Sequence, residues 1–314
     1  MAKCAVTGGA GFIGSHLVEG LVNRGHEVLV VDDFSSGRME NLAGVELGGA
    51  VRLLRLDISV PGALDGVFDG VRWVFHHAAV PSVSRSVDDP CGTNQINATG
   101  TLHVLEGARR AGVEKVMFAT SCSVYGDSEE LPKREEMPAT PLSPYALQKY
   151  VGELYCRMFS DLYGIPTMAL RYFNVFGPRQ DPKSEYAAVI PRFITRMLAG
   201  QAPIIYGDGE QTRDFIYVDN VVDANLKAAE SAASGTVLNI GLGRRVSLNE
   251  IVDLLNSILK TSIQPEYQDA KRGEVRHSVA DIRAAKEKMG FVPGVDFCEG
   301  LKRSVMWYRQ RGNS

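Results

Sequence analysis

The run Thr7-Gly8-Gly9-Ala10-Gly11-Phe12-Ile13-Gly14 joins an apolar strand pattern to a helical one and decides the fold class of this chain. Gly8 permits a tight turn, Gly11 lets the backbone approach a pyrophosphate, and Gly14 allows close packing of helix on strand. The amino terminus of the helix would face the anion. Glycine triads also occur in plain strand-to-helix turns, so the context has to decide. The residues that we assign to a dinucleotide loop are Gly8, Gly11, Phe12, Ile13 and Gly14.

An acidic residue at the end of the second expected strand supplies that context. Asp32 lies about 20 residues beyond the loop, where a carboxylate accepts hydrogen bonds from an adenosine ribose and repels a 2'-phosphate. This position favours NAD over NADP, although Arg38 nearby leaves NADP open, and the acidic pair could simply begin a polar turn. We assign Asp32, Asp33, Ser36 and Gly37 to the cofactor site.

Short β-branched runs alternate with longer amphipathic stretches through the first half of the chain, which is typical of a parallel sheet wound with crossover helices. We expect strands at 4–7, 27–31, 51–56, 73–76, 115–119 and 167–172. Helices are expected to begin near Gly11, Leu64 and Gly92 and after Ser143-Pro144, where a serine cap precedes a proline.

Beyond about Gly177 the pattern loosens into shorter elements punctuated by prolines, while a helix at 218–231 and a strand at 237–240 are expected to return to the main sheet. We therefore predict an α/β fold, a doubly wound parallel (Rossmann) sheet with a smaller, interleaved substrate-binding lobe. Residues 1–176 would mainly form the NAD-binding domain, with returning segments at about 214–242. Residues 177–314 would mainly form the substrate lobe.

Composition narrows the class of protein. The net charge of −3 offers nothing to attract nucleic acid or an anionic membrane. No apolar stretch approaches 18 residues, and the amino terminus lacks the pattern of a signal peptide. The five cysteines are scattered without metal-ligand spacing, so we expect a reducing compartment and no metal site. These features predict a cytoplasmic protein.

Tyr145 and Lys149 lie four residues apart on the helix after Pro144 and therefore share one face. A free tyrosine titrates near pH 10, and an adjacent ammonium is expected to lower its pKa toward the working pH of a general base. Ser121 follows the fifth strand, at the edge of the sheet where doubly wound folds bind ligands. Its hydroxyl is expected to bond the reacting sugar oxygen. Although the Tyr-x-x-x-Lys spacing alone is common, these three residues behind a dinucleotide loop predict a catalytic set.

Further motifs follow in order along the chain: Asp57-Ile58, His77-Ala78-Ala79, Asn97, Ser121 to Gly126, Arg171 to Pro178, and Arg213-Asp214-Phe215. With the glycine loop and the Tyr145 to Lys149 motif, they make nearly the whole chain similar to the extended short-chain dehydrogenase/reductase family. Within that family it resembles the UDP-hexose 4-epimerases.

The resemblance implies roles residue by residue. Further contacts with NAD fall on Asp57, Ile58, His77, Ala78, Ala79, Asn97, Tyr145, Lys149 and Phe173. The UDP-sugar would contact Ser121, Ser123, Tyr145, Asn174, Ala188, Val189, Arg192, Tyr206, Arg213, Lys271, Glu274 and Ser278. Asn174 and Arg213 would meet the diphosphate, and Tyr206 would stack near the uracil. As alternatives, Phe173, Val189 and Tyr206 could be plain core residues, and Asn97 could merely brace its helix.

The reaction implied by the resemblance is NAD-dependent inversion at C4 of a UDP-hexose through a 4-ketose. A 4,6-dehydratase is disfavoured because that class carries an Asp-Glu pair where this chain has Cys122 and Ser123. UDP-glucuronate 4-epimerisation stays open because Arg192 could pair with a sugar carboxylate, or could be a solvated surface arginine. A non-catalytic, dinucleotide-sensing scaffold would have no reason to keep the three catalytic residues. By analogy we also expect a homodimer, formed through the helices that include 92–110 and 145–163.

Substrate choice is expected to depend on a residue late in the chain. The run from Lys271 to Ser278 aligns with a family motif whose last residue gates the pocket, and a small serine leaves room for an acetamido group. We therefore predict activity on UDP-N-acetylglucosamine as well as UDP-glucose. The family motif usually reads Arg-x-Gly-Asp, whereas this chain has Lys271 and Glu274, so Arg272 or Arg276 could share the diphosphate.

Overall fold

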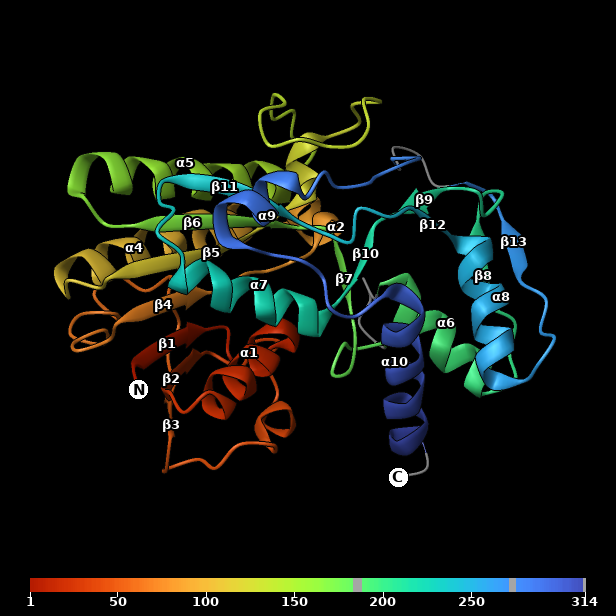
Figure 1. Cartoon of the computed structure of the whole chain (residues 1–314), viewed down its shortest axis with the longest axis horizontal. Coiled ribbons are helices and arrows are strands. Elements are labelled where there is room, and N and C mark those ends of the chain that lie inside the picture. Colours follow the sequence, from red (N-terminus) through yellow and green to blue (C-terminus); the bar gives the residue numbers. More distant parts are fainter. Residues whose placement is uncertain (183–187, 271–274, 313–314) are drawn as a thin grey trace.

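The computed structural model describes residues 1–182, 188–270 and 275–312 (Figure 1). Seven strands form one parallel sheet in the order β11-β6-β5-β4-β1-β2-β3. These strands are β1 (Lys3–Thr7), β2 (Glu27–Asp32), β3 (Val51–Arg55), β4 (Trp73–His76), β5 (Lys115–Ser121), β6 (Thr167–Tyr172) and β11 (Thr236–Ile240). The order of the first six is that of a doubly wound fold, which confirms the predicted class. The chain returns at β11 to pair with β6, as expected from the sequence.

Helices cover both faces of this sheet because successive strand side chains point to opposite sides. One apolar cluster joins the sheet to α1 (Phe12–Asn23), α7 (Val218–Glu230) and α9 (Arg283–Met289). A second cluster, on the opposite face, joins it to α4 (Gly100–Arg110) and α5 (Pro144–Tyr163). The short elements between β4 and α4 are α2 (Val83–Asp88), α3 (Pro90–Asn94) and the π-helical turn η2 (Gln95–Thr99). The remaining short helices of this part are η1 (Met39–Leu42) and η3 (Cys122–Tyr125).

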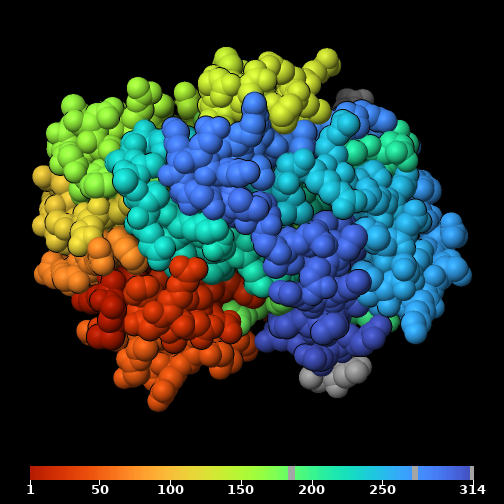
Figure 2. Space-filling model, viewed as in Figure 1, coloured from red at the N-terminus to blue at the C-terminus, as the bar shows by residue number. Residues whose placement is uncertain are grey.

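A separate apolar core lies at the other end of the molecule, where α6, α8 and α10 gather (Figure 1). Its helices are α6 (Val189–Leu198), α8 (Leu248–Leu259) and α10 (Phe297–Gly312). Three two-stranded sheets accompany them: β7 (Asn174–Phe176) with β10 (Phe215–Tyr217), β9 (Thr212–Arg213) with β12 (Val246–Ser247), and β8 (Ile204–Tyr206) with β13 (Glu266–Gln268). In the space-filling view the C-terminal segments, coloured blue, spread across the middle of the face and against both parts of the molecule (Figure 2).

The helix expected near Leu64 is wrong, because residues 60–70 form consecutive turns. Gly62, Gly66 and Gly70 all have positive φ, between 70° and 77°, and each ends a turn. Backbone bonds in this segment span three residues, such as Asp65 N–H to Gly62 O and Val67 N–H to Leu64 O. A left-handed residue at every fourth position stops the right-handed helix from propagating, although Leu64 and Phe68 are still buried.

Candidate active site

The glycine loop connects β1 to α1 in the conformation that the sequence predicts. Gly8 has φ +70°, and a Cβ there would lie 2.6 Å from the amide nitrogen of Ala78. A Cβ on Gly14 would lie 2.1 Å from the Gly8 carbonyl oxygen, so only glycine lets the helix approach the loop this closely. Gly11 caps α1, whose first turn has no acidic residue, and the first amides of a helix have no intrahelical acceptor. Phe12 and Ile13 therefore present backbone N–H groups suited to an anion.

Asp32 ends β2 beside this loop, and only 6% of its surface is exposed. Its carboxylate accepts hydrogen bonds from the backbone N–H groups of Ala10 (2.9 Å) and Phe34 (2.8 Å). A Cβ on Gly37 would lie 2.6 Å from the Asp32 carboxylate, so the backbone at Gly37 packs directly against it. Asp33 accepts bonds from Ser35, and Ser36 is exposed. Asp32 thus organises the turn in which a ribose would lie.

Arg38, which left NADP open, pairs with Asp181 at 2.5 Å. Its guanidinium is therefore engaged by a carboxylate from the segment that follows β7. On the far side of the loop, Asp57 caps a turn by accepting the Ser59 N–H at 2.8 Å, and Ile58 is buried against Gly100. These two residues, to which the resemblance assigns the adenine contacts, follow β3 in the chain.

His77, Ala78 and Ala79 follow β4, next to the glycine loop. The Ala78 N–H donates to the Thr7 hydroxyl at 3.3 Å. His77 stacks on Tyr172, with Nε2 at 3.0 Å from the phenol oxygen, and its buried Nδ1 has no protein partner. Burial lowers the pKa of His77 to about 3, so this ring is neutral.

Asn97 is 1% exposed and lies in the π-helical turn η2. Its amide accepts the Val80 N–H at 2.7 Å and donates to the Val80 carbonyl and to Gln148 Oε1. The side chain therefore braces the backbone after Ala79 against α5 and makes no bond to its own helix among the described contacts. π-helical turns are common at functional sites, and η2 is the turn that contains Asn97.

Ser121, Tyr145 and Lys149 meet at the carboxyl edge of the sheet. Ser121 ends β5, and its hydroxyl accepts the Ser123 N–H at 3.2 Å. α5 begins at Pro144 under a Ser143 cap, as predicted, and carries Tyr145 and Lys149 one turn apart. Lys149 is 4% exposed, and its ammonium donates to the Ala119 carbonyl at 2.9 Å.

The expectation that Lys149 lowers the pKa of Tyr145 is wrong. Burial raises the pKa of Tyr145 to about 12, and the hydrogen bond from Ser121 is what opposes this rise. Lys149 points to Ala119, over the Phe118 ring at 5.0 Å, and burial lowers its own pKa to about 8. The physical reason is that two buried polar groups each lose water, and this cost exceeds any attraction between them.

Several predicted substrate residues are joined through the backbone around Asp214. Asn174 donates from its backbone and side chain to the Asp214 carbonyl, at 3.0 and 3.2 Å. Ser278, 9% exposed, donates its N–H to the Thr212 carbonyl, beside Arg213. Arg213 is half-buried and donates to the carbonyls of Thr212 and Arg276. The structure thus brings Asn174, Arg213 and Ser278 together.

The other predicted substrate residues lie apart from this group. Ala188 caps α6, Val189 begins it, and Arg192 lies half-buried in its first turn. Tyr206 ends β8 and is half-buried. Lys271 and Glu274 lie outside the described residues. Phe173 is 1% exposed and packs in an apolar cluster with Val124, Tyr125, Met137 and Ala280.

Comparisons with known proteins agree with this geometry. Residues 4–241 match the NAD dependent epimerase/dehydratase family. This chain belongs to that family. A UDP-glucose 4-epimerase of Mycolicibacterium smegmatis is 40% identical over 98% of this chain and 99% of its own length. Two solved structures are also 40% identical. One is a UDP-N-acetylglucosamine 4-epimerase of Methanobrevibacter ruminantium in complex with UDP-N-acetylmuramic acid, with a TM-score of 0.95 over 99% of both chains. The other is a UDP-glucose 4-epimerase of Thermotoga maritima with UDP-glucose, with a TM-score of 0.93 over 98% and 99% of the chains.

The cofactor of this epimerase-family chain is NAD, in agreement with the position of Asp32. Across the described ranges, His, Cys, Asp and Glu side chains form no group that could hold a metal ion. Nor does any helix in those ranges have both the length and the apolar character needed to cross a membrane.

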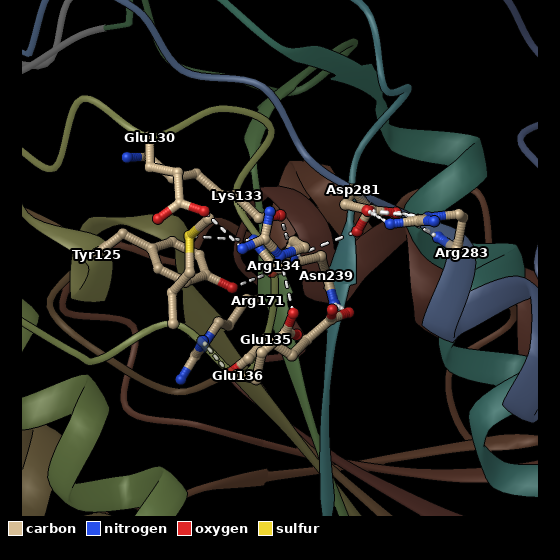
Figure 3. A network of polar contacts seen from close by, with 11 residues as sticks. Tyr125, Glu130, Lys133, Arg134, Glu135, Glu136, Arg171, Asn239, Asp281 and Arg283 are labelled. Carbon is tan, nitrogen blue, oxygen red and sulfur yellow. Dashed lines mark hydrogen bonds and ion pairs between the residues drawn. The ribbon is translucent and has the colours of Figure 1, made fainter.

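Sequence reasoning on this family member missed a polar network beside the site (Figure 3). The Tyr125 phenol donates to Asn239 Oδ1 at 2.7 Å, and Arg171 lies over the Tyr125 ring at 4.7 Å. Asn239 also donates its N–H to Glu135 at 2.7 Å. Together these contacts tie the segment after Tyr125 to β6 and β11. The residues are far apart in the chain, and none of their spacings signals the network.

Asp214 is a second residue whose structural role was not predicted from the sequence. It is fully buried and accepts backbone N–H groups from Leu242, Gly243 and Ala280 at 2.8 to 3.0 Å. Burial raises the pKa of Asp214 to about 6. An acidic residue directly before the apolar run that starts at Phe215 was the available signal, because a buried carboxylate needs partners.

Proposed function

We propose that this protein is a UDP-hexose 4-epimerase that interconverts UDP-glucose and UDP-galactose and also accepts the N-acetylhexosamine forms. The observation that carries the proposal is that α5, which carries Tyr145 and Lys149 one turn apart, packs on β5, which ends in Ser121 at the same sheet edge as the glycine loop. Identity of 40% over nearly the whole chain to a UDP-glucose 4-epimerase supports the same activity.

The residues present fit NAD. Gly8 and Gly14 leave no room for a side chain, so the loop backbone stays open to a pyrophosphate at the start of α1. Asp32 would hold the adenosine ribose, Asp57 and Ile58 would flank the adenine, and Ala78 and Ala79 would line the path to the nicotinamide. When bound, NAD would supply a hydride acceptor for oxidation at C4 and a hydride donor for the reduction that follows, without net consumption of cofactor.

The residues of this chain move the proton and hold the sugar. Tyr145 would take the proton of the 4-hydroxyl as C4 is oxidised, and would give a proton back to the 4-oxygen when C4 is reduced from the opposite face of the ketose. Ser121 donates to the reacting oxygen and steadies the phenol. Lys149, released from Ala119 toward the site, would supply the positive charge that favours phenolate.

We assign substrate anchoring to the group around Asp214. Asn174 and Arg213 would bind the diphosphate, for which a planar guanidinium is suited. Ala188, Val189 and Tyr206 would contact the nucleotide, so that it stays bound while the ketose turns over. Residues 1–176, with the return at about 214–242, would act as the cofactor domain, and 177–314 as the substrate lobe.

Dehydration is disfavoured by the residues after Ser121. Elimination of water needs an acid and a base there, and this chain has Cys122 and Ser123. Burial raises the pKa of Cys122 to about 12, so its thiol stays neutral.

The test is product analysis with catalytic amounts of NAD and a panel of UDP-glucose, UDP-galactose and their N-acetyl and uronic-acid counterparts. We expect C4 epimers without net cofactor reduction. Tyr145→Phe should lower kcat by about 100-fold or more because it removes the proton acceptor. Stoichiometric NAD consumption, or full activity of Tyr145→Phe, would contradict the proposal.

We also propose a homodimer through α4 and α5. Large apolar side chains are exposed along one side of α5, at spacings of seven and four residues: Leu147, Leu154, Met158 and Leu162. Met158 also lines a groove between the two helices, together with Leu102, His103, Glu106, Tyr155, Phe159 and Tyr163. Contiguous apolar surface of this kind is typical of an interface.

Five free cysteines are consistent with a cytoplasmic location.

A further inference from the structure

One backbone N–H in the first turn of α5 donates to a residue that lies far away in the sequence. Pro144 has no N–H, Ala146 donates to the Ser143 hydroxyl at 3.2 Å, and Leu147 donates to the Ser143 carbonyl at 3.0 Å. The N–H of the proposed base, Tyr145, has no acceptor within its own helix. It donates instead to the hydroxyl of Ser86 at 2.9 Å, 59 residues earlier in the chain.

Ser86 is fully buried, and its hydroxyl has a fixed direction. It lies in α2, which packs against α5, and donates to the Val83 carbonyl at 2.6 Å. A hydroxyl has one hydrogen to donate. Because the Ser86 hydroxyl donates this hydrogen to the Val83 carbonyl, its oxygen acts as the acceptor for the Tyr145 N–H.

A second tie joins the same two segments. Gln148, one turn after Tyr145, accepts from Asn97, and Asn97 holds both the N–H and the carbonyl of Val80. The segment from Val80 to Ser86 directly follows the cofactor motif His77 to Ala79. It is therefore bonded to α5 at both of its ends, once through Asn97 and once through Ser86.

We propose that Ser86 is a positioning residue for the epimerase reaction, which sets where Tyr145 stands relative to Ser121 and the cofactor loop. It touches neither the phenol nor a ligand, and it acts through the backbone of Tyr145. The inference rests on the proposed function. Small displacements of a reacting group are costly in rate while leaving distant binding contacts intact.

The experiment compares Ser86→Ala, Ser86→Thr and the wild type as NAD-loaded enzymes turning over UDP-glucose. Ser86→Ala should lower kcat about tenfold or more and leave KM within about twofold. Ser86→Thr keeps the hydroxyl and should restore kcat to within about threefold of wild type. Ser304→Ala is the matched control, because Ser304 is also fully buried and bonds only locally, to Gly300 in α10.

Amide hydrogen exchange of the peptide that contains Tyr145 provides a readout that needs no turnover. Exchange at that amide should speed up in Ser86→Ala and stay unchanged in Ser304→Ala. Unchanged exchange, wild-type kcat in Ser86→Ala, or an equal loss of kcat in Ser304→Ala would each overturn the inference. A wild-type enzyme that turns over no UDP-sugar would reject the proposed function instead.

Discussion

The side chain of Lys149 is almost entirely buried, and its ammonium donates a hydrogen bond to the Ala119 carbonyl. Burial lowers its pKa to about 8, below the value of about 10.4 for an unfolded chain. Below pH 8 both states carry the proton, and the folded state bears the full cost of burying the charge. Between about pH 8 and 10.4 only the folded state has lost the proton, so this contribution to stability rises with pH.

Replacing Lys149 with Met should therefore stabilise the protein while abolishing activity. We expect a gain of about 2 kcal/mol in the free energy of unfolding at pH 7, because the variant of similar volume removes the buried charge. The gain should shrink toward pH 9.5 and above, roughly one to two units past the folded pKa. Urea denaturation at both pH values measures it. A variant less stable than wild type at pH 7 would contradict the prediction.

Ser278 tests substrate choice at the scale of one side chain. It is buried, and its segment is held by the backbone bond to Thr212 and by the isolated bridge between Lys133 and Ala280. A larger side chain has no room to move away. Ser278→Tyr should lower kcat/KM for UDP-N-acetylglucosamine about 100-fold and for UDP-glucose less than about tenfold. Ser278→Ala is the control and should keep both substrates, whereas equal losses for Ser278→Tyr would refute the gate.

At the scale of elements, α5 is fastened to the sheet by a buried ion pair. Arg171 of β6 makes two bonds to the Glu153 carboxylate, at 2.7 and 2.9 Å, and Thr120 of β5 donates to the same carboxylate at 2.8 Å. The two charged side chains are 4% and 3% exposed. Because Glu153 lies one turn after Lys149, the ion pair holds this helix on β6, and the Thr120 bond holds it on β5, the strand that ends in Ser121.

Glu153→Gln should destabilise the protein by about 3 kcal/mol, because it leaves a buried guanidinium without its counter-charge. Thermal and urea unfolding measure the loss. The matched control is Glu114→Gln, which breaks an exposed pair with Arg72 and should change stability by less than about 0.5 kcal/mol. Equal effects of the two substitutions would show that burial does not govern the strength of the pair.

On the scale of the whole molecule, the exposed apolar side of α5 should determine the oligomeric state. Met158 is 49% exposed at the centre of that side. Met158→Glu should convert a dimer to a monomer, because a carboxylate would be buried without a partner at the interface. Light scattering after size-exclusion chromatography measures the mass. Met306→Glu, at an exposed methionine of α10, should leave the mass unchanged. A wild-type monomer would refute the interface.

Local sequence determined much of this protein. The glycine loop, the Ser143 cap and the spacing of Tyr145 and Lys149 depend on residues close in the chain, where backbone sterics and helix geometry act directly. The parallel sheet followed from alternating strand and helix patterns, and was confirmed. The failure near Leu64 has the same local origin, since its three left-handed glycines outweighed an apolar pattern that suited a helix.

Only the tertiary structure decided the electrostatics and the supports of the site. The Tyr145 pKa rises because folding removes water, and Lys149 turns to a carbonyl that β5 brings beneath it. Ser86 and Glu153 reach partners 59 and 18 residues away along the chain. Such contacts leave no spacing in the sequence, because chain topology rather than local geometry sets which distant groups meet, and burial then sets how strongly they interact.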